Sequence, residues 1–305
     1  MKVFRSLAAV PSLSSGTAVA VGNFDGLHRG HRRILGLLVE RARAAGLPAC
    51  VLTFSPHPER FFRTRRLSMI QTLDQRLDGL ADAGVDLALV VPFDRTFARL
   101  SAEAFVGRVL VRTLRAQLVI VGRAFRFGCD RAGDVAELRR LGRAAGFATL
   151  SVPRLTWKGH VVSSSLIRRL LAHGRVGTAR ALLGRPFEVE GDVVRGDGRG
   201  RGLGFPTANL ETPNEILPRG VFLTRFRVGG EDRPALTSVG VRPTFGEHVV
   251  TVETHILRFH RDIYGEAVKV LFLKKLRDEK RYPSPGALVA RMRKDRAAAR
   301  RYFGR

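Results

Sequence analysis

The 305 residues, 45% of them apolar, are enough to fill the core of one large domain or two ordinary ones, which excludes a disordered tail or a fibre. No apolar run approaches the roughly 20 residues of a membrane-spanning helix, and the N-terminus lacks a secretory apolar segment, so we expect a soluble, cytoplasmic protein. The 53 basic residues against 27 acidic ones give a net charge of +26, which attracts polyanions, but the arginines are spread along the chain and do not by themselves indicate nucleic-acid binding.

In the first half of the chain, short apolar runs alternate with amphipathic stretches. This pattern predicts a doubly wound α/β domain, in which a parallel sheet is covered by helices on both faces. We expect strands at residues 17–21, 49–54, 86–91, 118–121 and 147–152. We expect helices at residues 30–45, 73–83, 102–114 and 134–145, followed by one more helix at 166–183, and Ser101 is a candidate N-cap.

After residue 184 the pattern changes. Apolar residues tend to alternate with polar ones, as in Val221–Phe226, and Gly-rich turns separate the runs. A long helix returns only at the end, where Ser284 and Pro285 are predicted as N-cap and first residue of a basic helix running to about Tyr302. The second half is therefore predicted to be a small antiparallel β-barrel closed by a C-terminal helix. The expected domains are residues 1–185 and 186–305.

The most specific motif follows the first predicted strand and leads directly into a predicted helix. It reads Gly22-Asn23-Phe24-Asp25-Gly26-Leu27-His28-Arg29-Gly30-His31. A helix N-terminus presents free N–H groups and a positive dipole, and the His-x-Gly-His spacing is typical of nucleotidyltransferases, where imidazoles stabilise charge on the attacked α-phosphate and on pyrophosphate. Because His28 and His31 lie at the carboxyl end of a strand, where open α/β sheets bind ligands, a triphosphate site is favoured over two merely exposed histidines.

Two further motifs contain groups that bind phosphate. Serines at 163–165 precede a predicted helix, and Arg168 lies one turn into it; alone, this is only an N-cap with an arginine. In the second half, glycine occupies every second position from Gly196 to Gly204, with Arg199 and Arg201 between. Such a loop can wrap a polyphosphate, although glycine alternation is equally typical of a disordered surface hairpin. No glycine is followed by lysine, which excludes a P-loop.

This ordered series of motifs resembles the bacterial bifunctional riboflavin kinase and FAD synthetase family, whose first half is an FMN adenylyltransferase. The match runs through nearly all of the sequence. It also includes Phe54-Ser55-Pro56-His57-Pro58, Phe125-Arg126-Phe127-Gly128, Leu183-Gly184-Arg185-Pro186 and Pro206-Thr207-Ala208-Asn209.

The resemblance implies two ATP sites and assigns residues to each. In the first half it implies a nucleotide site at Gly22, Asn23, Phe24, Asp25, Gly30, His28 and His31, closed by Ser164 and Arg168, with flavin near Phe54, Pro56, Pro58 and Phe125. In the second half it implies nucleotide binding at Gly200, Gly202, Thr207 and Asn209, Mg²⁺ at Thr207 and Asn209, a catalytic base at Glu253 and a flavin contact at Arg277. Strand alternation puts Glu253 and His255 on one face, which allows either as base and also allows an ordinary surface pair. For the Phe54–Pro58 turn, Ser-Pro and His-Pro dipeptides also end strands for conformational reasons alone.

The implied function is phosphorylation of riboflavin to FMN, followed by adenylylation of FMN to FAD with release of pyrophosphate. The expected partners are therefore small molecules, and neither nucleic acid nor a membrane is expected. Four positions depart from the family pattern: Ala124 replaces an acidic or amide residue, Ser165 a threonine, Leu166 an arginine and Arg258 an aspartate. Ala124 and Leu166 keep open a kinase whose first domain only binds ligands, and the charge of +26 keeps open a nucleic-acid-binding protein.

Overall fold

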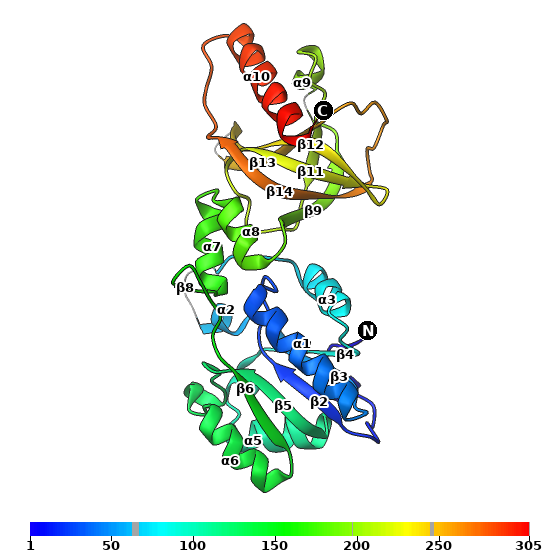
Figure 1. Ribbon diagram of the computed structural model, residues 1–305, viewed down its shortest axis with the longest axis vertical. Helices are drawn as coiled ribbons and strands as arrows, with labels where there is room; N and C mark the ends of the chain where they lie inside the picture. Colours follow the sequence, from blue (N-terminus) through cyan, green and yellow to red (C-terminus); the bar gives the residue numbers. More distant parts are fainter. Residues whose placement is uncertain (63–66, 197, 245–246, 305) are drawn as a thin grey trace. The chain divides into compact units, whose positions relative to one another are not determined.

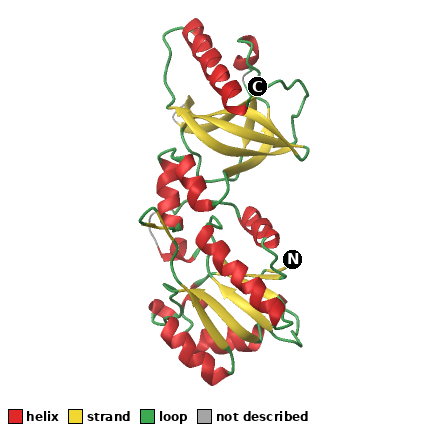
Figure 2. Cartoon of the chain, in the orientation of Figure 1, coloured by secondary structure: helices red, strands yellow, loops and turns green. Residues whose placement is uncertain are grey.

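The computed structural model describes residues 1–62, 67–196, 198–244 and 247–304 (Figures 1 and 2). The chain divides into two compact units. The first comprises Met1–Leu67 and Thr72–Ser163, and the second comprises Ser68–Gln71 and Ser164–Arg305. Helices α7 and α8, which lie before the boundary predicted near residue 185, therefore group with the second unit.

A parallel sheet forms the centre of the first unit (Figure 1). Its strands, in spatial order, are β1 (Lys2–Phe4), β4 (Leu87–Pro92), β3 (Ala49–Ser55), β2 (Thr17–Val21), β5 (Ala116–Gly122) and β6 (Ala148–Val152). The direction of winding reverses between β2 and β5, because β3 and β4 lie on one side of β2 and β5 and β6 on the other. The carboxyl ends of β2 and β5 thus meet at the switch point where sheets of this kind bind ligands.

Helices cover both faces of this sheet, which confirms the doubly wound prediction. Side chains of α1 (Arg29–Ala44) and α3 (Leu73–Asp82) pack on one face, and those of η2 (Val106–Thr113) and α6 (Val135–Ala145) pack on the other. Val19 and Ala20 of β2 are both fully buried, one in each of these cores. The shorter elements are η1 (Leu7–Ala9), α2 (Pro58–Phe62), α4 (Arg95–Ala98), α5 (Ala102–Phe105), η3 (Cys129–Arg131), β7 (Thr156–Trp157) and β8 (His160–Val161).

Two details of the first unit differ from the sequence prediction. Strand β1 was not expected, and it pairs with β4 through three residues, with Val3 opposite Ala88. The helix expected at 102–114 begins as α5, where Ser101 accepts a hydrogen bond from the Ala104 N–H as predicted, but continues as the π-helical segment η2. Leu114 N donates to Val109 O, five residues back, so this turn is wider than an α-helical one.

The second unit is built on a closed antiparallel barrel, as predicted (Figure 2). Its strands, in spatial order, are β10 (Ala208–Glu211), β13 (Glu247–Ile256), β12 (Glu231–Thr244), β11 (Gly220–Val228), β14 (Ala267–Arg277) and β9 (Phe187–Val194). Three threonines, Thr224, Thr237 and Thr254, lie fully buried in the barrel. The Thr237 hydroxyl is 2.8 Å from that of Thr224 and 2.9 Å from that of Thr254, so polar atoms inside the barrel hydrogen-bond one another.

Helices lie outside the barrel strands. The expected single helix at 166–183 is wrong: α7 (Ser164–Ala172) and α8 (Val176–Leu183) are separate helices. Gly174 between them has φ +67°, and its N–H donates to Leu171 O, which ends α7 in a left-handed turn that suits glycine. The C-terminal helix α10 (Pro285–Phe303) is confirmed, with Ser284 Oγ accepting from the Ala287 N–H.

Candidate active sites

The loop after β2 holds buried residues in strained backbone. Phe24 and Leu27 have φ angles of +50° and +41°, in the left-handed region that side chains other than glycine rarely adopt, and both side chains are 1% exposed. Thr53 Oγ1 in β3 donates to the Asn23 carbonyl over 3.1 Å, which ties the loop to the neighbouring strand. Backbone strain of this kind concentrates at functional sites, where the surrounding structure sustains it.

His28 and His31 come together at the start of α1. His28 is the N-cap: its Nδ1 accepts from the His31 N–H over 3.2 Å. The two imidazole rings stack with centroids 3.6 Å apart, and the His31 ring also meets the edge of Phe24 at 5.3 Å. A methyl group at Gly30 would approach within 3.1 Å of the His28 ring, so glycine leaves room for this stack.

Both imidazoles are neutral at physiological pH. Burial lowers the pKa of His28 from 6.5 to about 4. Burial, together with the charges of His28 and Arg76, lowers the pKa of His31 well below its ordinary value. Because His28 Nδ1 accepts a hydrogen bond, the single proton of its neutral ring lies on Nε2, where it can be donated to a ligand.

Arg76 is a buried cation of this site that the sequence analysis missed. Its Nη1 donates to Thr53 Oγ1 at 3.2 Å and to the Phe54 carbonyl at 3.1 Å, and the carboxylate of Asp25, also buried, attracts its charge. One sequence feature could have identified Arg76: it lies on the apolar face of α3, three residues after Leu73 and four before Leu80, where a charged residue is unusual.

The residues expected near flavin lie along a chain of aromatic rings. Phe54 is 5.7 Å from Phe97, and ring contacts then continue through Phe105 and Phe127 to Phe125, which stacks on Phe127 with centroids 5.5 Å apart. Pro56 and Pro58 follow β3, where Pro58 begins α2. The structure therefore joins the two predicted flavin segments through one aromatic cluster.

Ser164 and Arg168 belong to the second unit. Ser164 is the first residue of α7, and Arg168 Nε donates to the Ser68 carbonyl over 2.9 Å. Their part in closing the nucleotide site remains a prediction.

In the barrel, strand register brings three predicted residues together. Asn209 in β10 pairs directly with Glu253 in β13, so their side chains lie on the same face. The neighbouring pair, Ala208 and Thr254, is buried, which places Asn209 and Glu253 on the outer face of the barrel wall, and Thr207 precedes Asn209 by two residues.

The glycine loop approaches this face closely. A methyl group at Gly196 would overlap the Asn209 side chain, and one at Gly200 would approach within 3.2 Å of Thr207 Oγ1. The Gly200 carbonyl accepts from the Phe205 N–H over 2.8 Å, and α9 (Arg199–Gly202) forms one helical turn here (Figure 1). The expected contribution of charge from the interposed arginines falls on side chains outside the described set.

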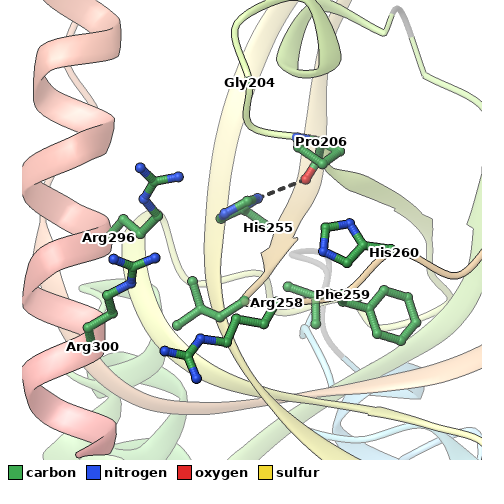
Figure 3. A pocket seen from close by; sticks show the side chains of 10 residues that line it. Gly204, Pro206, His255, Arg258, Phe259, His260, Arg296 and Arg300 are labelled. Atoms are coloured by element: carbon green, nitrogen blue, oxygen red, sulfur yellow. Dashed lines mark hydrogen bonds between the residues drawn. The ribbon is translucent and has the colours of Figure 1, made fainter. Parts of the chain in front are cut away.

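A cavity of about 240 Å³ lies beside the end of this loop (Figure 3). His255 forms part of its wall, with Nδ1 donating to the Pro206 carbonyl over 2.9 Å and its ring 5.3 Å from that of Phe205. Burial lowers the pKa of His255, so the ring is neutral and its proton lies on Nδ1. His255 therefore fixes the end of the glycine loop at Pro206. Of Glu253 and His255, Glu253 is the candidate base.

Arg277, predicted to contact flavin, is held by the C-terminal helix. Its Nε and Nη2 lie 2.9 and 2.8 Å from the Asp295 carboxylate, and Nη1 donates to the Asp278 carbonyl. Arg291 Nε approaches the second oxygen of Asp295 at 3.1 Å. Asp295 is 4% exposed, so two arginines meet one buried carboxylate.

Comparison with known proteins matches each half of the chain to a family. Residues 10–166 match the FAD synthetase family, and residues 183–303 match the riboflavin kinase family. Over its full length the chain is 38% identical to the bifunctional riboflavin kinase/FMN adenylyltransferase of Escherichia coli K12, of which 98% is covered. The chain belongs to this bifunctional family. The riboflavin kinase/FMN adenylyltransferase of Pseudomonas fluorescens is also 38% identical, with 98% of this chain and 97% of that protein covered.

The riboflavin kinase/FMN adenylyltransferase fold is shared with a solved structure. A crystal structure described as a macrolide-efflux protein from Streptococcus pneumoniae superposes with a TM-score of 0.89 at 28% identity, covering 98% of each chain. This agreement extends over both the sheet and the barrel. Within the described part of the chain, no helix combines the length and apolar character needed to cross a membrane.

Proposed function

We propose that the chain makes FMN from riboflavin in the barrel and FAD from FMN in the α/β unit, using one ATP in each reaction. The observation that carries the proposal is that each matched family range contains its own cluster of groups suited to phosphate: the histidines at the start of α1 in one, and the glycine loop beside Asn209 and Glu253 in the other. In functional terms we assign residues 1–185 to adenylyl transfer and 186–305 to the kinase, and we place the enzyme in the cytoplasm.

In the kinase reaction, Glu253 would take the proton of the ribityl 5′-hydroxyl of riboflavin. The hydroxyl oxygen attacks the γ-phosphorus of ATP, the bond to the β–γ bridging oxygen breaks, and ADP leaves. Glu253 suits this role because its strand partner Asn209 lies beneath the loop that would hold the phosphates. Positioning and neutralisation of charge dominate catalysis of phosphoryl transfer.

The residues at this site fit Mg²⁺ held largely by the nucleotide. The described residues contain no group of three or more His, Cys, Asp or Glu side chains that could hold a metal. Thr207 and Asn209 instead offer neutral oxygen donors, and the backbone of Gly200 and Gly196 lies so close to them that a side chain at either glycine would crowd these donors. Mg²⁺ prefers oxygen and is usually bound by one or two protein groups together with phosphates and water. When bound, it would neutralise charge on the transferred phosphate.

In the adenylyl transfer reaction, a phosphate oxygen of FMN attacks the α-phosphorus of ATP, and the bond to the α–β bridging oxygen breaks to release pyrophosphate. No protein base is required, because the FMN phosphate is already an anion. His28 would donate its Nε2 proton to a phosphate oxygen, and the N-terminus of α1 adds free N–H groups. Arg76 would fix the carboxyl end of β3 through its hydrogen bonds to Thr53 and Phe54, and its positive charge would attract the polyphosphate.

Chromatographic separation of FMN and FAD over time tests the assignment. With riboflavin, ATP and Mg²⁺, the wild type should form FMN and then FAD. Glu253→Gln should lose FMN formation and retain FAD formation from supplied FMN, whereas His28→Ala should do the reverse. Matched controls are Glu188→Gln on β9 and His160→Ala on β8, which should retain both activities. A single variant that abolishes both reactions in a folded protein would contradict the division into two sites.

A kinase with a binding-only first domain is the second candidate. Ala124 and Leu166 motivate it, because each removes a polar or charged group from a motif of the resemblance. Incubation of the wild type with FMN, ATP and Mg²⁺ decides between the two, since this alternative predicts that FMN binds but no FAD forms. Retention on DNA or RNA that falls steeply with salt, without ATP turnover, would instead favour a nucleic-acid-binding protein.

A further inference from the structure

Thr53 is a fully buried threonine in the otherwise largely apolar strand β3. Its hydroxyl donates to the Asn23 carbonyl over 3.1 Å and accepts from Arg76 Nη1 over 3.2 Å. A hydroxyl carries one donor and two acceptor positions, so both hydrogen bonds form at once. Thr53 therefore links helix α3, which carries Arg76, to the loop that leads from β2 to His28 at the start of α1.

Helix α3 approaches the same loop at two further points. A methyl group at Gly79 would overlap the Leu27 side chain, so the helix lies directly against that residue. The buried carboxylate of Asp25, in the middle of the loop, attracts the charge of Arg76. The position of the loop thus depends on α3, and the hydroxyl of Thr53 is the hydrogen-bonded part of that connection.

The loop needs such support because its backbone is strained. Phe24 and Leu27 both have left-handed φ angles, a conformation that costs free energy and persists only where the surrounding structure sustains it. His28 follows Leu27 directly, caps α1 and stacks on His31. A shift of the loop would therefore move both imidazoles, and in reactions that depend on positioning a displacement of about 1 Å can cost about 100-fold in rate.

A second buried threonine in the same unit separates burial from this connection. Thr17, the first residue of β2, is also 0% exposed, and its hydroxyl donates to the Leu114 carbonyl over 2.6 Å. It lies at the amino end of β2, whereas the strained loop follows the carboxyl end. Both threonines are buried and both donate to a backbone carbonyl, but of the two it is Thr53 that is bonded to the loop.

We propose that Thr53 is a positioning residue for adenylyl transfer. Its hydroxyl, fixed by Arg76, holds the Asn23 carbonyl and so keeps His28 and His31 in place for the polyphosphate. Thr53 acts through the loop and does not itself contact substrate. The inference rests on the proposed assignment of FAD formation to this unit, and it requires the hydroxyl of Thr53 rather than the size of its side chain.

Kinetics of three full-length variants test the role of the hydroxyl, with FMN, ATP and Mg²⁺ as substrates for FAD formation. Thr53→Val keeps the shape and removes the hydroxyl, so kcat/KM should fall about tenfold or more. Thr53→Ser restores the hydroxyl and should stay within about threefold of the wild type. The matched control Thr17→Val also loses a buried hydrogen bond and should stay within about threefold. FMN formation from riboflavin, measured in the same samples, should be unchanged in all three.

Three outcomes would overturn the proposal. Wild-type kcat/KM in Thr53→Val would show that the hydroxyl is not needed, and an equal loss in Thr17→Val would show a general effect of lost stability. Failure of Thr53→Ser to recover activity would assign the effect to packing of the methyl group. Trp157 fluorescence in urea confirms that the first unit is folded in each variant. If Thr53→Val does not fold, Thr53→Ala replaces it, because it removes the hydroxyl without placing a methyl group against the two partners.

Hydrogen exchange tests the hold on the loop separately from catalysis. Peptide mass spectrometry follows the backbone amides of residues 22–28, including the Leu27 N–H, which donates to the Phe24 carbonyl over 3.3 Å. We expect exchange there to be about tenfold faster in Thr53→Val and unchanged in Thr53→Ser and Thr17→Val. Unchanged exchange in Thr53→Val would overturn the inference whether or not FAD forms. If the wild type forms no FAD, the proposed function is wrong, and the exchange result alone decides whether Thr53 holds the loop.

Discussion

The buried neutral state of His28 predicts a specific loss of stability in acid. The unfolded chain binds a proton at this imidazole below pH 6.5, whereas the native protein does so only near pH 4. Between these values the unfolded state holds more protons, so the stability that is present above pH 6.5 is lost progressively as the pH falls. The gap corresponds to about 3 kcal/mol in total, and to about 2 kcal/mol between pH 7 and pH 5.

His28→Asn isolates this contribution. Asparagine cannot be protonated in this range and is a preferred N-cap, so it keeps an acceptor for the His31 N–H. The protein contains a single tryptophan, Trp157 in β7 of the first unit, so its fluorescence follows unfolding of that unit in urea. From pH 7 to pH 5 the wild type should lose about 2 kcal/mol more than His28→Asn does.

An exposed histidine provides the matched control for this experiment. His160 lies in β8 of the same unit and is exposed, so His160→Asn should keep the pH dependence of the wild type. If the wild type and His28→Asn instead lose stability in parallel, His28 is protonated freely in the native state. The argument that this site holds neutral imidazoles would then be wrong.

Two further predictions concern the barrel unit, whose unfolding is followed by far-UV circular dichroism, with Trp157 fluorescence unchanged as the internal control. Thr237→Val should lower the stability of the barrel by about 2 kcal/mol, because the buried hydroxyls of Thr224 and Thr254 each lose a hydrogen-bond partner. A loss of less than about 0.5 kcal/mol would show that the hydrogen bonds among these three threonines do not stabilise the barrel. Asp295→Ala should cost about 3 to 5 kcal/mol, because it leaves Arg277 and Arg291 without their shared carboxylate; wild-type stability would show that the two arginines find other partners or water.

The sequence predicted those features that depend on local periodicity and capping. The strand β2 is fully buried and is apolar after Thr17, and Ser101 and Ser284 each begin a helix as N-cap. The break between α7 and α8 was missed because apolar spacing continues across it, and only Gly174 marks the turn. Strand β1 has three residues, too few for a period to be recognised.

The candidate sites were predictable to the extent that their residues are close in sequence. His28 and His31 lie within one turn, so the stacked pair follows from the motif. Arg76 approaches them only because α3 packs on the sheet, and no local pattern reports that contact. Arg277 shows the opposite case: the position was singled out, but its ion pair with Asp295, eighteen residues later, depends on how α10 packs against the barrel.

The net charge of +26 gave little information because the two candidate phosphate sites rely on other properties. At the start of α1, the groups that would meet ATP are neutral imidazoles and backbone N–H groups, with Arg76 as a single buried cation, and at the barrel they are glycine backbone, a hydroxyl and an amide. Such groups bind phosphate by exact placement, which short motifs specify and composition does not. Charge becomes informative only where the fold concentrates it, as it does with Arg258, Arg296 and Arg300 around one cavity. Sequence spacing alone does not bring Arg258 to Arg296 and Arg300, which follow it by 38 and 42 residues.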